Sequence, residues 1–160
     1  MGMKGISPVI AAVVLIAITI AVGVLLSGWV TQFVTKETET ASACITNTNY
    51  KIDSATYTAG TKQLTIMVTN LNVRDLYGFS VQIQNTTNIV IYNYTESDFT
   101  ISPNVSKSEP LKDQRSAIIL INTTGAKGDY SNLAYTATEL KVLNSACPTF
   151  SIKTSQIEKE

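Results

Sequence analysis

The hydrophobic and polar positions divide the chain into two parts. Thirty residues from Ile6 to Thr35 carry no charged side chain and are mostly apolar. As a helix, this segment would be roughly 45 Å long at 1.5 Å per residue, which exceeds the ~30 Å hydrocarbon thickness of a bilayer. The segment therefore predicts a helix that is held in a membrane or passes through it. From Lys36 to Glu160 the chain has the polarity of a domain that lies outside the membrane.

Beyond the apolar segment, hydrophobic and polar residues alternate in short runs, which is typical of β-strands. Ala59–Thr61 and Asn85–Asn88 have the composition of hairpin turns, Gly125–Asp129 that of a longer connection, and Ser102–Gln114 that of a long surface loop. The predicted strands are 50–58, 63–70, 78–84, 88–94, 116–122 and 133–143, with weaker ones at 44–48, 99–101 and 150–153. Short strands at this spacing, without a helical pattern between them, predict an immunoglobulin-like β-sandwich.

The fold class expected for the whole chain is therefore α+β, with a long N-terminal hydrophobic α-helix followed by an all-β sandwich. Residues 36–43 are expected to be a linker, and residues 44–160 the outer domain. About 125 residues outside the helix are enough for one compact domain and no more.

Composition narrows the possible functions. The formal net charge is zero and only 15% of the residues are charged, so no basic surface points to nucleic acid. The chain has no histidine, the commonest general base and metal ligand, and no carboxylate pair or phosphate-binding loop is evident. We therefore expect no enzyme, no catalytic site, no cofactor and no metal, although Glu96 and Asp98 could hold calcium weakly. A surface rich in Thr, Ser and Asn suits a glycosylated extracellular protein.

The two cysteines, Cys44 and Cys147, lie near the ends of the polar part and about 103 residues apart. This spacing excludes a CxxC redox or zinc motif. In an exported domain the two are expected to form a disulfide that ties the first strand to the last; two free buried thiols are the alternative. Closing a loop of this length would stabilise the domain by ~4–5 kcal/mol in the chain-entropy model.

The N-terminus does not have the pattern of an ordinary secretory signal, because the apolar segment is about twice too long. A possible cleavage site at Ala41–Ala43 is separated from that segment by charged residues. The junction Lys4-Gly5-Ile6-Ser7-Pro8-Val9-Ile10 instead resembles the processing site of archaeal type IV pilin precursors, which carry a class III signal peptide. The resemblance covers about residues 4–30. It implies that residues 1–5 are a leader, that a prepilin peptidase cleaves between Gly5 and Ile6, and that the helix stays on the mature protein.

Small residues recur along the apolar segment. Thr19, Gly23 and Ser27 are spaced four apart, and Ala17 and Ala21 form a second close pair. Such spacing lets helices approach closely in an apolar environment, so we expect this face to pack against other copies. The alternative is a plain single-span anchor in which the small residues are incidental.

Four Asn-X-Ser/Thr sequons lie in predicted turns or near strand ends, and as a set they predict N-glycosylation. The acceptor residues are Asn85, Asn93, Asn104 and Asn122, of which Asn93 is the one that can lie within a predicted strand. Bare asparagines that serve the turns are the alternative.

Together, these features favour a structural subunit of an archaeal type IV adhesion pilus. The resemblance implies that the helix polymerises with copies of itself, with the β domain on the surface of an extracellular filament. It also implies three partners besides the membrane: the prepilin peptidase, an assembly ATPase and a membrane platform protein. The alternative is a monomeric membrane-anchored extracellular binding domain.

Overall fold

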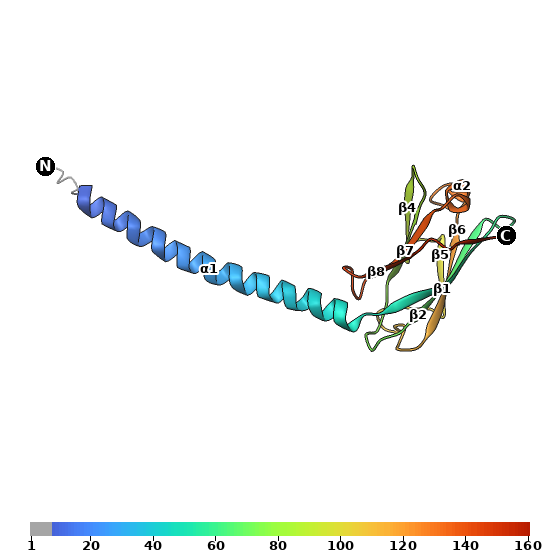
Figure 1. The fold of residues 1–160 in the computed structure, drawn as a ribbon, viewed down its shortest axis with the longest axis horizontal. Helices are drawn as coiled ribbons and strands as arrows, with labels where there is room; N and C mark the ends of the chain where they lie inside the picture. Colours follow the sequence, from blue (N-terminus) through green and yellow to red (C-terminus); the bar gives the residue numbers. More distant parts are fainter. Residues whose placement is uncertain (1–7) are drawn as a thin grey trace. The chain divides into compact units, whose positions relative to one another are not determined.

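The computed structural model describes residues 8–160, which divide after Ser42 into two units (Figure 1). Helix α1 (Pro8–Asn47) runs through the first unit, and its last turn belongs to the second unit, Ala43–Glu160, which we call the β unit. With 40 residues, α1 is about 60 Å long. It is long and apolar enough to cross a membrane, which confirms that part of the sequence prediction.

The end of α1 differs from the prediction. The expected linker 36–43 and the weak strand expected at 44–48 are both wrong, because α1 remains helical through Asn47. The physical reason lies in the sequence, which has no glycine or proline between Gly28 and Asn47 and contains the good helix formers Lys, Glu and Ala there. A change from apolar to charged residues changes the surroundings of a helix but does not end it.

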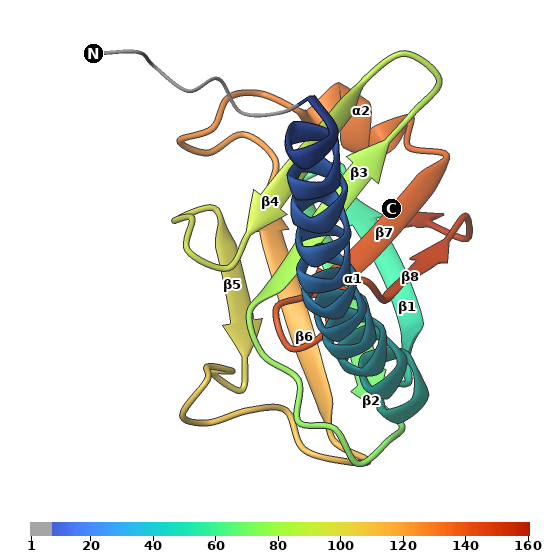
Figure 2. The same cartoon turned by 90° about the vertical axis from the view of Figure 1, so that its left-hand side faces the viewer.

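The β unit is a sandwich of two sheets, which Figure 2 shows from a second direction. One sheet has the strand order β5-β6-β2-β1-β9 and the other β4-β3-β7-β8. The strands are β1 (Tyr50–Thr58), β2 (Gln63–Asn70), β3 (Phe79–Gln84), β4 (Ile89–Asn93), β5 (Phe99–Ser102), β6 (Ser116–Asn122), β7 (Glu139–Asn144), β8 (Ser151–Thr154) and β9 (Glu158–Lys159). Neighbours pair antiparallel except β1 with β9, and the order of the first eight strands is that of an immunoglobulin-like sandwich.

The core lies between the two sheets and follows the alternation in the sequence. On β2, every second residue from Leu64 to Asn70 is buried, and β3 and β7 alternate in the same way. On β1 the alternation is interrupted at Asp53, where a β-bulge shifts the register against β2. Tyr50 is buried before the bulge and Ala55 and Tyr57 after it, so the extra residue corrects the phase of the inward-facing positions.

Most predicted strands are confirmed within one residue at each end. Besides the strand expected at 44–48, the exception is the strand expected at 133–143, which the structure divides into helix α2 (Ser131–Tyr135) and strand β7. Leu133 and Ala134 are adjacent and both buried, which a helical turn permits and a strand with one buried face does not. Strand β9 was not predicted, since two residues are too short for any periodic pattern.

Candidate functional site

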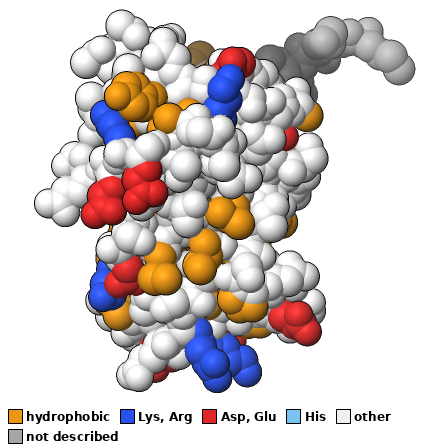
Figure 3. All heavy atoms as spheres, turned by 90° about the vertical axis from the view of Figure 1, so that its right-hand side faces the viewer, with side chains coloured by type: hydrophobic (Ala, Val, Ile, Leu, Met, Phe, Trp, Pro, Cys, Tyr) orange, Lys and Arg blue, Asp and Glu red, His pale blue; other side chains and the backbone are white. Residues whose placement is uncertain are grey.

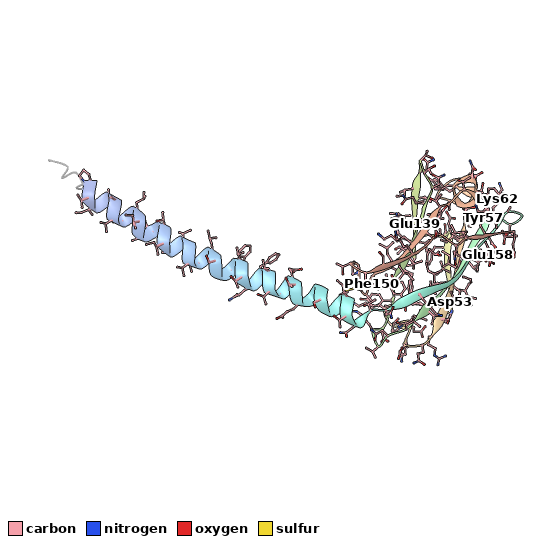
Figure 4. All side chains as sticks on the ribbon, in the orientation of Figure 1. Asp53, Tyr57, Lys62, Glu139, Phe150 and Glu158 are labelled. Carbon is pink, nitrogen blue, oxygen red and sulfur yellow. A yellow bond between two sulfur atoms is a disulfide. The ribbon has the colours of Figure 1, made fainter. Side chains whose placement is uncertain are left out.

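From Pro8 to Val34 the surface of α1 is largely apolar on all sides, whereas Lys36, Glu37 and Glu39 are charged. Its large apolar side chains from Val9 to Val34 are exposed, and Figure 4 shows side chains leaving the helix all around its axis. A helix of this kind has no polar face to present to water, and such helices are found in membranes or in the core of larger assemblies. The described part of α1 is therefore the first candidate for a functional surface.

The small residues predicted to pack against other copies lie in the middle of α1. All five positions, Ala17, Thr19, Ala21, Gly23 and Ser27, are exposed. A Cβ added to Gly23 would meet no atom of the described residues within 4 Å. The Thr19 hydroxyl donates to the carbonyl oxygen of Ile16 at 2.8 Å, so its polar group is satisfied within the helix. Thr19, Gly23 and Ser27 lie four residues apart on one side of α1, and their small side chains make this side a flat face. The Thr19 hydroxyl needs no partner outside the helix, which suits close approach in an apolar environment.

Cys44 and Cys147 form a disulfide, as predicted, with their Cα atoms 5.5 Å apart. The expectation that it ties the first strand to the last is wrong. Cys44 lies in the last turns of α1, and Cys147 lies in the connection between β7 and β8. The reason is the extension of α1, which places helix where a first strand was expected. The bond therefore joins the end of α1 to the β-sandwich, and both cysteines are buried.

One hydrogen bond involves Cys147 itself, and a second connects β7, the strand before it, to β1, the first strand of the sandwich. The backbone N–H of Cys147 donates to Oδ1 of Asn144 at 2.8 Å, and the Tyr50 hydroxyl donates to the carbonyl oxygen of Val142 at 2.8 Å. Burial raises the pKa of the Tyr50 hydroxyl to about 12. The last turn of α1, which belongs to the β unit, is thus bonded covalently to the sandwich.

Two of the four sequons share one geometry. In Asn85 and Asn122, the side-chain Oδ1 accepts hydrogen bonds from the backbone N–H and the hydroxyl of the threonine two positions on. The oxygen-to-hydroxyl distance is 3.2 Å in both. Asn122 is exposed, whereas Asn85 is half-buried and its Nδ2 donates to Thr136 Oγ1 at 3.0 Å. The glycan-accepting nitrogen of Asn85 therefore has a protein partner.

The other two sequons are also on the surface. Asn93 is the last residue of β4, where its Oδ1 accepts from Ser80 Oγ at 3.0 Å and its Nδ2 donates to Glu96 at 3.2 Å. Asn104 is exposed in the loop after β5. Glycosylation of all four remains a prediction.

The acidic pair considered for calcium has protein partners instead. The buried Asp98 carboxylate accepts hydrogen bonds from the backbone N–H groups of Ala126 and Lys127, both at 2.9 Å. Glu96 forms an ion pair with Lys127 Nζ at 2.7 Å. Asp98 thus organises the connection from β6 to α2, a role that sequence reasoning missed because donor and acceptor are 28 residues apart.

Figure 3 shows one face, on which acidic and basic side chains lie singly or in small groups among uncharged atoms. Among the described residues no group of three or more His, Cys, Asp or Glu is placed to hold a metal ion.

No protein-family model and no curated protein matches the chain. Function therefore has to be inferred from the residues and their geometry. Gly5 and Ile6, the residues of the predicted cleavage site, lie outside the described residues.

Proposed function

We propose that the chain is a structural subunit of an archaeal type IV adhesion pilus, which polymerises through α1 and carries the β unit on the filament surface. The observation that carries the proposal is the apolar surface of α1, exposed on all sides of the described helix. A structural role needs no catalytic residue and no cofactor.

The same helix suits two environments in turn. An α-helix satisfies its own backbone hydrogen bonds, so it is compatible with lipid before assembly. In a filament core the neighbouring copies would replace the lipid as apolar surroundings. The flat face around Gly23 supports this second environment. Glycine lowers the stability of a helix by ~1 kcal/mol relative to alanine, and lipid alone offers no compensation for this loss. Close packing against a neighbouring helix does.

The β unit suits an outer surface. Its apolar side chains are largely buried within the sandwich, a disulfide bonds the last turn of α1 to it, and four sequons lie on the exterior. In this proposal the prepilin peptidase removes residues 1–5. An assembly ATPase and a membrane platform protein then move the mature subunit from the membrane into the extracellular filament.

The test is electron microscopy of material sheared from cells that express the chain, combined with mass spectrometry of the purified protein. We expect filaments whose main subunit begins at Ile6. Gly5→Leu should prevent cleavage and leave the precursor in the membrane, whereas Gly2→Leu, the same change three residues upstream, should be processed normally. Single copies that remain in the membrane of cells with a complete assembly system would instead identify a monomeric anchored binding domain.

A further inference from the structure

The β unit has exposed apolar side chains around the turn through which α1 enters it. Val73 is 72% exposed, Leu71 44% and Ile45 53%. We call these three residues the root patch. Val73 and Leu71 lie in the connection between β2 and β3, and Ile45 lies in the last turn of α1. Asn72 Nδ2 donates to the carbonyl oxygen of Thr46 at 3.3 Å, and the Leu71 N–H donates to that of Asn49 at 2.8 Å, which joins the two segments.

The loop that presents Val73 is held by polar contacts. The buried Asn70 donates through Nδ2 to the carbonyl oxygens of Arg74, at 2.8 Å, and Leu111, at 3.0 Å. Its Oδ1 accepts from the N–H of Asn72 at 3.2 Å, and Asn72 Oδ1 accepts from the N–H of Val73 at 2.8 Å. An apolar side chain on a loop that is already ordered loses little conformational entropy when a partner covers it.

A filament core of α1 helices needs a cover on its outer side. Because α1 is largely apolar on all sides from Pro8 to Val34, helices that have left the lipid would expose apolar surface to water wherever no neighbour lies against them. The β units make up most of the rest of the described chain, so we expect them to supply that cover. Covalent continuity requires the end of the β unit that receives α1 to lie next to the core, and the root patch is at this end.

We infer that the root patch is a docking surface for the apolar part of α1 of a second copy, within residues 8–35. The inference rests on the proposed function and adds the contact that links the outer domain to the core. Each subunit would contribute one patch and one helix, so the interface is heterologous and repeats along the filament. The contact covers α1 and at the same time removes Val73, Leu71 and Ile45 from water.

A second exposed apolar pair provides the control. Ile89 and Ile91 on β4 are 55% and 41% exposed, similar to the root patch, but they lie on an edge strand of the other sheet. Covalent continuity places no constraint on their position relative to a core of helices. A general tendency of apolar side chains to become covered would affect the root patch and the control pair alike, whereas docking of α1 would affect the root patch alone.

Single cysteines can measure this difference, because the two native cysteines are bonded to each other. The V73C and I89C variants of the full chain are labelled with a maleimide, first as detergent-solubilised monomers and then as filaments. We expect V73C to lose most of its labelling on assembly and I89C to keep it. Equal labelling of V73C in monomers and filaments overturns the inference. Peptide mapping checks that the native disulfide is retained.

The identity of the partner is tested by incorporating a benzophenone amino acid in place of Val73 during synthesis and illuminating the filaments. We expect a covalent dimer in which the cross-linked peptide derives from residues 8–35 of the second copy. Cross-links to the β unit of the second copy overturn the choice of partner. If wild-type cells assemble no filaments, the proposed function fails and the inference falls with it. Filaments with an uncovered Val73 overturn the inference alone.

Discussion

In the β unit, Ile66, Val81 and Leu140 are fully buried, whereas in α1 the large apolar side chains are exposed. The two units thus differ in how their apolar side chains are removed from water. The β unit closes two sheets over one core and needs no other molecule to do so. α1 satisfies its backbone by its own hydrogen bonds, but its side chains require an apolar environment from outside the chain.

Because of this difference, the stability of the protein and its assembly should depend on different units. The stability of the β unit depends on its own sequence, so substitutions there should change its unfolding without changing membrane insertion. The state of α1 depends on what surrounds it, so substitutions there should change assembly without changing the folding of the β unit. Variants that change both the unfolding of the β unit and the assembly of filaments would contradict this division of roles.

The largest effect is expected from Gly23→Leu, which adds a branched side chain where we expect a neighbouring helix. Overpacking costs about 1–3 kcal/mol per site, and in a filament the cost repeats at every subunit. Leucine is well accommodated in lipid, so the variant should be processed and inserted but should form few or no filaments. Counting filaments by electron microscopy measures the effect.

Gly28→Leu makes the same change about 140° around the helix from Gly23 at 100° per residue, on the side that holds Ala17 and Ala21, and so compares the two sides with small residues. A Cβ added at either glycine would meet no described atom within 4 Å, so neither change disturbs a contact within the described chain. We expect Gly28→Leu to assemble better than Gly23→Leu. Normal filament numbers with Gly23→Leu would show that this face does not pack against another helix.

The next largest effect is expected from loss of the disulfide through the double variant C44A/C147A. The bond closes a loop with a sequence separation of 103, for which the chain-entropy model gives ~4–5 kcal/mol. Denaturant unfolding of the detergent-solubilised full chain should show the β unit less stable by about this amount, with filament assembly largely retained. Thr149→Val, which removes a hydroxyl 3.6 Å from the Cys44 sulfur, should have little effect. Free thiols in the wild-type protein would contradict the bond itself.

The sequence predicted most strands of the β unit because one face of each strand is buried, and burial of one face imposes a period of two on the residues. The strands 50–58, 63–70 and 116–122 match in full. It did not predict where α1 ends, because Lys36 to Asn47 contains neither a breaker nor an apolar pattern. Helix α2 was missed since five residues are too few to show a period of 3.6.

The candidate functional features also differ in whether the sequence alone could predict them. The disulfide was predictable because only two cysteines exist, and the flat face of α1 because small residues recur at a helical spacing. The root patch was not, since the exposure of Val73 depends on how the loop after β2 folds around the buried Asn70. The role of Asp98 likewise depends on two segments that meet only in the folded sandwich.

A smaller effect is expected from alkaline pH. The pKa of Tyr50 is about 12 in the folded β unit, against an ordinary value of 10.0. As pH rises above 10 the unfolded chain loses this proton first, so stability that is fully present below pH 10 declines between pH 10 and 12. Two pKa units correspond to about 2–3 kcal/mol. Unfolding measured across this range should show the decline.

Tyr50→Phe should make the decline shallower, although not abolish it, because burial also raises the pKa of Tyr92 to about 12. The variant also loses the hydrogen bond to Val142, so it should be less stable than wild type at neutral pH. Tyr94→Phe removes an exposed hydroxyl and is the control. An unchanged decline in Tyr50→Phe would show that another group causes it.

The smallest effect concerns the contact between Gly125 and Asp98. A Cβ added at Gly125 would lie 1.8 Å from the Asp98 Oδ1, so the carboxylate would have to leave the N–H groups of Ala126 and Lys127. We expect Gly125→Ala to destabilise the β unit by about 1 kcal/mol, while Gly60→Ala, where the added Cβ meets nothing within 4 Å, should cost nothing or stabilise slightly. In an Asp98→Ala background the colliding carboxylate is absent, and the loss of stability caused by Gly125→Ala should largely disappear.

A double-mutant cycle by denaturant unfolding measures this coupling between Gly125 and Asp98. Additive effects would show that the glycine is required by the backbone rather than by Asp98. In either case filament numbers should stay normal, because the contact lies within the unit that folds on its own core.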